Sequence, residues 1–250
     1  MTPEDVVARL RAAGCVFAED EAELLLAAGG DVAGLVTRRV AGEPLEVVLG
    51  WAAFDGLRVP VSAGVFVPRQ RTRWLVAEAA RLAPQAAVVL DLCCGSGAVG
   101  AALAVRLPGA EVHAADVDPA AVACARRSLP AGRVHLGDLY DALPAALRGR
   151  VDLLAVNAPY VPTDAIALMP PEAREHEARV SLDGGADGVD VQRRVAAGAR
   201  EWLGPSGVLL VETSVAQAST TAAVLEAAGL RAQVTRSEEL DGTVVVGRRR

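Results

Sequence analysis

The feature that most constrains the fold is an alternation of short apolar runs and helix-like segments that starts near residue 86. The first run, Ala87–Leu92, is apolar at almost every position, which is typical of a strand buried on both faces. Further strands are expected at Glu111–Asp116, Arg133–Leu136, Val151–Val156, Gly207–Glu212, Leu230–Arg236 and Thr243–Gly247, and helices at Ala98–Leu107, Pro119–Leu129, Val189–Leu203 and Val215–Ala228. This order predicts an α/β, Rossmann-like domain with a seven-stranded, mostly parallel sheet.

The residues before this alternation predict a small helical domain. Thr2 followed by Pro3 is a typical helix start, and Gly14 would end that helix. A second helix is expected at Ala18–Ala28, and Asp31 is suited to cap a third that reaches about Val40. We therefore assign residues 1–45 to a small N-terminal helical domain.

A β-hairpin is expected next. Two apolar runs, Trp51–Phe54 and Leu57–Val61, are separated by Asp55-Gly56, a dipeptide that favours a tight two-residue turn. A helix from about Thr72 to Ala83 follows. The chain is thus divided into residues 1–45, a hairpin linker over residues 46–70, and the α/β domain over residues 71–250.

Composition argues against several classes of function. The formal net charge is −6, which disfavours broad contact with nucleic acid. No apolar run reaches 18 residues and the first residues do not resemble a signal peptide, so we expect a cytoplasmic protein that contacts no membrane. The four cysteines form no C-x-x-C pair, and no metal site is expected. The sequence does not specify an oligomeric state, and a monomer is the default expectation.

A glycine-containing turn follows the first strand of the alternation. Cys93-Cys94-Gly95-Ser96-Gly97 connects the strand to the next helix, and glycines there let the backbone approach a ligand closely. Gly95 to Gly100 also fits the dinucleotide fingerprint G-x-G-x-x-G, with Asp116 about 20 residues further on, where an acid binds ribose hydroxyls. A dinucleotide-dependent dehydrogenase therefore remains an alternative at this point.

Two more side chains favour S-adenosylmethionine as the ligand. Asp91 lies at the end of the strand, where its carboxylate can reach the turn or the cationic methionine part of the ligand. Asp138 follows the third strand and is suited to bind an adenine amino group, while Leu139 can pack on the adenine ring. The expected cofactor-binding set also includes Asp116, Asn157 and the turn residues Cys93, Cys94, Gly95, Ser96 and Gly97.

The segment Asn157-Ala158-Pro159-Tyr160 follows the fourth strand and predicts chemistry on nitrogen. An amide nitrogen is a poor nucleophile because its lone pair is delocalised. The Asn157 side-chain oxygen and the Ala158 carbonyl can each accept one N–H bond and orient that nitrogen toward a methyl donor. Pro159 stiffens the turn, and Tyr160 can form a wall for a planar substrate.

Taken together, these motifs resemble the HemK-type protein glutamine N5-methyltransferases. The similar stretches are Gly42–Leu45, Gly64–Arg69, the glycine turn, Asn157–Tyr160 and Leu182–Gly188. The resemblance implies a class I methyltransferase sheet, S-adenosylmethionine as cofactor and a peptide release factor as protein substrate. Ala158 stands where the family has a proline, and Gln70-Arg71-Thr72-Arg73 replaces its Pro-Glu-Thr-Glu, which marks a divergent member.

Three alternatives to a glutamine methyltransferase remain. The first is an N-methyltransferase that acts on a nucleobase amine, a peptide or a small molecule. The second is a binding protein that keeps the fold without catalysis, and the third is the dehydrogenase. Residues 161–188 form a long irregular segment after the chemical loop, which is typical of a lid or substrate-recognition loop. Within it, His176 is expected to be a surface residue rather than a base.

Overall fold

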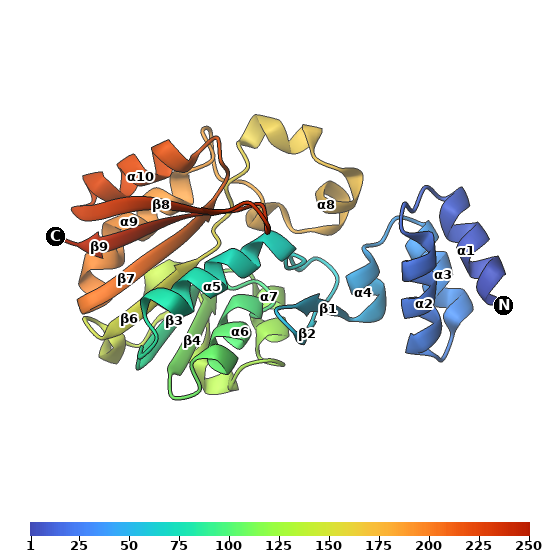
Figure 1. Cartoon of the computed structure of the whole chain (residues 1–250), viewed down its shortest axis with the longest axis horizontal. Coiled ribbons are helices and arrows are strands. Elements are labelled where there is room, and N and C mark those ends of the chain that lie inside the picture. The colour runs from blue at the N-terminus through green and yellow to red at the C-terminus, as the bar shows by residue number, and fades with distance from the viewer.

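A computed structural model describes residues 1–250, and in it a twisted sheet lies between two layers of helices (Figure 1). The strand order is β5-β4-β3-β6-β7-β9-β8, with β9 antiparallel to both of its neighbours and the other pairings parallel. The strands are β3 Val88–Leu92, β4 Glu111–Asp116, β5 Val134–Leu136, β6 Val151–Val156, β7 Leu203–Thr213, β8 Leu230–Ser237 and β9 Gly242–Arg249. The predicted seven-stranded, mostly parallel sheet is confirmed.

Strand β3 lies inside the sheet, between β4 and β6, and is apolar at every position except Asp91. All five of its residues are buried, and Val89 is in register with Val112 of β4 on one side and Leu153 of β6 on the other. The chain runs outward from β3 through β4 to β5, and then returns to place β6 and β7 on the other side. This reversal creates a crevice at the carboxyl ends of β3, β4 and β6, the usual ligand position in such sheets.

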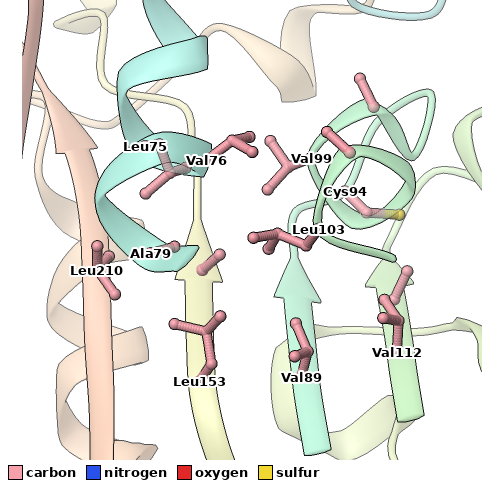
Figure 2. Packing of buried hydrophobic residues seen from close by; sticks show 14 of the residues in the cluster. Leu75, Val76, Ala79, Val89, Cys94, Val99, Leu103, Val112, Leu153 and Leu210 are labelled. Atoms are coloured by element: carbon pink, nitrogen blue, oxygen red, sulfur yellow. The ribbon is translucent and has the colours of Figure 1, made fainter. Parts of the chain in front are cut away.

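Helices cover both faces of the sheet. They are α5 Arg73–Leu82, α6 Ala98–Arg106, α7 Pro119–Ala125, α9 Asp190–Trp202 and α10 Ala218–Ala227. Figure 2 shows α5 and α6 packing over β3, β4, β6 and β7, where Leu75 and Leu103 meet Val89 and Leu153. On the opposite face, α9 and α10 contribute Val195 and Leu225 to a second apolar core. Both cores are mainly aliphatic, as expected from an aromatic content of 3%, with Phe54 in the first and Trp202 in the second.

Helix α7 is shorter than the sequence predicts. It was expected to reach Leu129, but it ends at Ala125 and continues as a tighter turn, in which Arg127 N–H bonds to the Cys124 carbonyl. Pro130 explains the difference, because a proline disfavours helical geometry at the residue before it.

The N-terminal helices form a bundle with a core of its own. They are α1 Pro3–Ala12, α2 Ala18–Ala28 and α3 Val32–Val40, in close agreement with the sequence prediction. Thr2 and Asp5 cap α1 reciprocally, and Asp31 caps α3 by accepting a bond from Gly34 N–H. Seven buried apolar residues, including Leu10 and Leu25, form a cluster separate from both cores of the sheet.

A short helix and a hairpin connect the bundle to the sheet. Helix α4, Leu45–Leu49, was not predicted and lies largely in the segment assigned to the linker. Its Val48 packs into the bundle, whereas Val47 packs against the hairpin, which explains why it forms. The hairpin strands are β1 Trp51–Phe54 and β2 Leu57–Pro60, and Asp55 at their turn accepts two hydrogen bonds of 2.7 Å from Arg106 of α6.

Residues 161–188 contain three short elements rather than a purely irregular loop. These are the 3-10 helices η5 Thr163–Leu168 and η6 Arg179–Ser181, and the helix α8 Pro171–His176. Glu172 of α8 bonds to Arg39 of the bundle at 2.9 Å, and the buried Glu177 bonds to Arg69 at 2.7 Å. The segment is therefore tied to the rest of the molecule at two points. Across the whole chain, no helix has both the length and the apolar composition to cross a bilayer.

The separate core of the bundle leads to a prediction about its stability. Leu25→Ala should destabilise the bundle by about 2–5 kcal/mol, because the fully buried side chain leaves a cavity. Hydrogen exchange should show opening of α1–α3 while the amides of β3–β7 stay protected. Leu24→Ala is the matched control, since Leu24 is 36% exposed and on the same helix. Equal loss of protection in bundle and sheet would contradict two independent cores.

Candidate active site

A cavity of about 300 Å³ lies at the carboxyl ends of β3, β4 and β6. Its position is the crevice that the reversal of strand order creates. Its lining comes from the turn after β3, the ends of β4 and β6, the segment Phe66–Thr72 and the loop Val180–Leu182. The volume lies at the lower end of the range for pockets that hold small organic ligands.

The turn between β3 and α6 forms the floor of the cavity. Cys93, Cys94, Gly95 and Ser96 line it, and Cys93 takes a left-handed φ of 57°. Gly97, which was predicted to bind the cofactor, is not among the lining residues. It has a φ of 79°, and a Cβ at this position would come within 3.0 Å of the Ala125 side chain. Gly97 therefore permits close packing of α6 on α7 rather than contact with a ligand.

Asp91 is a buried carboxyl group in the wall of the cavity. Its Oδ2 accepts a hydrogen bond of 2.8 Å from Gly100 N–H, whereas its Oδ1 has no protein partner. No cationic side chain pairs with it, and burial raises its pKa to about 7. A buried carboxyl group without a cationic partner is suited to bind a cationic ligand, because the ligand would supply the missing positive charge. The methionine end of S-adenosylmethionine is such a ligand.

Asp116 orients the glycine turn from the end of β4. Its two oxygens accept hydrogen bonds of 2.9 Å from the backbone N–H groups of Gly95 and Asp118. Burial raises the pKa of Asp116. Asp118 caps α7 by accepting a bond from Ala120 N–H, as the sequence predicts. Asp116 lines the cavity, so a ribose hydroxyl could still share its oxygens.

Asp138 and Leu139, which follow β5, also line the cavity. Leu139 has a left-handed φ of 48°, so the chain turns sharply there. Asp138 was expected to bind an adenine amino group, and in the structure its Oδ2 bonds to Arg194 of α9 at 2.6 Å. Its Oδ1 has no protein partner and stays available to a ligand. Arg194 also lines the cavity, and nothing in the sequence distinguishes it from other arginines on that helix.

Two hydrogen-bond acceptors without protein partners follow β6. Asn157 donates from Nδ2 to the Thr72 hydroxyl at 3.4 Å, which leaves its Oδ1 without a protein donor. Ala158 is fully buried and lines the cavity, and its carbonyl oxygen receives no hydrogen bond from the protein. Buried carbonyl groups are almost always paired. The two unpaired oxygens are therefore suited to bind the N–H groups of a substrate.

Pro159 and Tyr160 complete this loop and also line the cavity. The Tyr160 hydroxyl accepts a hydrogen bond of 2.8 Å from Arg71, and its backbone carbonyl accepts one of 2.9 Å from Gln217. Burial raises the pKa of Tyr160, so the phenol is neutral at physiological pH. The aromatic wall predicted at this position is thus fixed at both its backbone and its hydroxyl group.

Sequence reasoning missed Glu212, which lies near these residues at the end of β7. Only 2% of the residue is exposed, and neither carboxyl oxygen has a hydrogen-bond partner. Burial raises its pKa to about 7. The signal in the sequence was an acid directly after the apolar run Val208–Val211, where a strand buried on both faces should contain none. His176 is outside the cavity lining.

Comparison with known proteins identifies the family. A family model described as the methyltransferase small domain matches residues 62–176. A release factor glutamine methyltransferase of Geobacter sulfurreducens is 42% identical over 78% of this chain and 69% of its own length. A 4-amino-L-phenylalanine/4-methylamino-L-phenylalanine methyltransferase of Streptomyces pristinaespiralis is 35% identical over 78% and 69% of the two chains.

Solved structures confirm the class of fold. A methyltransferase from Pyrococcus furiosus superposes with a TM-score of 0.58 at 15% identity, over 77% of this chain and 89% of its own. At that identity the likeness concerns the fold alone. The sequence relatives are methyltransferases, which excludes the dehydrogenase alternative and identifies S-adenosylmethionine as the cofactor. The chain belongs to the release factor glutamine methyltransferase family and is an S-adenosylmethionine-dependent N-methyltransferase.

Proposed function

We propose that this enzyme methylates the side-chain amide nitrogen of a glutamine in a peptide release factor. The observation that carries the proposal is the pair of unpaired acceptors, Asn157 Oδ1 and the Ala158 carbonyl, beside a cavity suited to a cationic ligand. A primary amide carries two N–H groups, and two acceptors can bind both. The Geobacter relative, a release factor glutamine methyltransferase, supports the release factor as substrate.

The proposed cofactor position follows from the lining of the cavity. When bound, S-adenosylmethionine supplies a methyl group on a positively charged sulfur. Asp91 would face the cationic methionine part, Asp116 the ribose hydroxyls, and Asp138 with Leu139 the adenine. Between these positions the cavity is lined by residues without bulky side chains, so a ligand can approach the backbone. They are Cys93, Cys94, Gly95 and Ser96.

The loop after β6 would activate the amide without a strong base. Hydrogen bonds from the amide to Asn157 Oδ1 and the Ala158 carbonyl favour a pyramidal nitrogen, which exposes its lone pair. They also stabilise the positive charge that the nitrogen gains as it takes a methyl group, and its N–H becomes acidic at the same time. Only the backbone carbonyl of Ala158 is needed, so alanine in place of the family's proline is compatible with catalysis.

The division of labour along the chain is part of the proposal. Residues 71–250 carry the chemistry, whereas residues 1–45 and the linker at 46–70 would contact the protein substrate. Residues 161–188 border the cavity through Met169 and Leu182, and their exposed Leu168 and Val180 suit contact with a peptide. A cytoplasmic location and a monomeric state stay predictions.

Methyl transfer to a release factor can be tested directly. We expect label from methyl-labelled S-adenosylmethionine to appear on the glutamine of the Gly-Gly-Gln segment of a purified release factor. A release factor in which that glutamine is alanine should stay unlabelled. Label on nucleic acid, or on an arylamine amino acid such as 4-amino-L-phenylalanine, with the release factor unlabelled, would overturn the proposed substrate.

The role of Asn157 leads to a second prediction. Asn157→Ala should bind S-adenosylhomocysteine within a few fold of the unchanged enzyme, yet lose on the order of 10²-fold or more in turnover, because one of the two amide acceptors is gone. Calorimetry gives the affinity, and single-turnover kinetics give the methyl-transfer rate. Turnover near that of the unchanged enzyme would remove the assigned role.

The buried carboxyl group of Asp91 should couple cofactor binding to pH. Its pKa of about 7 in the folded protein lies above the ordinary value, so free enzyme carries the proton between about pH 4 and pH 7. A cationic ligand favours the ionised form, so binding in this range should release a proton, and affinity should rise with pH up to about 7.

Calorimetry of S-adenosylmethionine binding at pH 6, without a methyl acceptor and in buffers of different ionisation enthalpy, measures that proton. Asp91→Asn should abolish the release and weaken binding. Asp164→Asn changes an exposed acid outside the cavity and should leave the release intact. The assignment is wrong if proton release persists unchanged in Asp91→Asn.

A further inference from the structure

Glu212 is a buried acid that neither the fold nor cofactor binding explains. It follows Val211 of β7, which is in register with Val156 of β6, and Asn157 comes directly after Val156. The two polar residues therefore lie at the same end of neighbouring strands. Burying a carboxyl group without full hydrogen bonding costs free energy, so its presence beside the reactive loop indicates a function.

The groups that face Glu212 come from η1, Gln70–Thr72, and from the loop after β6. Arg71 Nε lies 3.7 Å from Glu212 Oε1, and Arg71 also bonds to the Tyr160 hydroxyl. The Thr72 hydroxyl makes no full hydrogen bond to the carboxyl group, but both Thr72 and Arg71 favour its ionised form. On the flanking strands, Glu212 is in register with Val244 on one side and lies beside Asn157, which follows Val156, on the other, and neither residue is ionisable.

Thr72 connects the acid to the reactive loop. Its hydroxyl oxygen accepts the hydrogen bond from Asn157 Nδ2 at 3.4 Å. A hydroxyl group has one hydrogen to donate, and an ionised carboxylate can only accept. An ionised Glu212 attracts the Thr72 hydrogen electrostatically, although no full hydrogen bond joins the two groups, and the threonine oxygen then faces the Asn157 NH₂ group. This direction leaves Asn157 Oδ1 free to accept from a substrate.

We propose that Glu212 is a positioning residue that acts through Thr72 to hold the Asn157 amide with its oxygen toward the methyl acceptor. The inference rests on the proposed function, in which that oxygen accepts a substrate N–H bond. A protonated Glu212 can instead donate to Thr72. The Thr72 hydrogen is then free to point at Asn157, and the amide can turn over and present NH₂ to the substrate.

A dependence on pH follows from this arrangement. Burial raises the pKa of Glu212 to about 7, against the opposing effects of Thr72 and Arg71, so its ionised fraction grows as pH rises through neutrality. Turnover at saturating cofactor should therefore rise through about pH 7. Saturation separates this effect from that of Asp91, which acts on cofactor affinity.

The arrangement can be tested without any methyl acceptor. In ¹H–¹⁵N spectra, the side-chain NH₂ signals of Asn157, assigned by their loss in Asn157→Ala, should shift with pH around 7. The shift should vanish in Glu212→Gln and persist in the control variant Glu78→Gln. Glu78 is also an acid that is only 2% exposed, but it lies on α5 and pairs with Arg81. An Asn157 signal that titrates equally in Glu212→Gln would overturn the proposal.

Kinetics supply the second test. Glu212→Gln and Thr72→Val should each lower turnover by roughly 10-fold and flatten the pH profile of turnover, while cofactor affinity stays unchanged. Because the two residues act in series, the double variant should lose little more turnover than either single variant. Thr72→Ser keeps the hydroxyl group and should retain most of the activity. Additive losses, or an unchanged pH profile in Glu212→Gln, would contradict the connection.

The experiments distinguish an error in the proposed substrate from an error in the proposed role of Glu212. If the release factor is not methylated but the Asn157 signals follow Glu212, the substrate is wrong and the positioning role stands. If the release factor is methylated but the Asn157 signals ignore Glu212, the proposed function stands and the positioning role is wrong. Thermal melting of each variant identifies any general loss of folding.

Discussion

The parallel pairing of β3 with both β4 and β6 is the interaction on which the rest of the structure depends. Because the three strands point the same way, their carboxyl ends open at one edge of the sheet. The cofactor-binding turn, Asp116 and the loop at Asn157 each begin where one of these strands stops. Residues more than 60 positions apart in the sequence, such as Asp91 and Asn157, thus line one cavity without any disulfide to hold them together.

The same apolar sheet also determines the electrostatics of the site. Asp91 and Glu212 both stand near the ends of strands, directly after a run of aliphatic residues, and burial raises the pKa of each to about 7. Water cannot solvate these carboxyl groups, so their charge depends on what the protein or a ligand places beside them. A fold that buries strands on both faces therefore yields carboxyl groups that respond to a cationic ligand or to a neighbouring hydroxyl group.

Most of the fold could be predicted because its signals are local. The run at β3, the Asp-Gly turn at residues 55–56 and the caps at Thr2 and Asp31 each depend on a few neighbouring residues, and all are confirmed. The missed features depend on distant partners. Helix α4 forms because Val47 and Val48 pack against two different units, and the importance of Glu212 appears only when β7 lies beside β6. Gly97 fits a ligand motif in sequence, yet it meets Ala125 of another helix.

Ion pairs link the wall of the cavity to units that are far apart in the sequence. Arg39 of the bundle is largely buried and bonds to Glu21 of its own unit and to Glu172 of α8. Glu177, at the end of the same helix, bonds to Arg69 in the wall of the cavity. Movement of the bundle would therefore strain α8, and movement of α8 would disturb Arg69. The N-terminal bundle and the wall of the cavity are in this way connected through α8, although they belong to units with separate apolar cores.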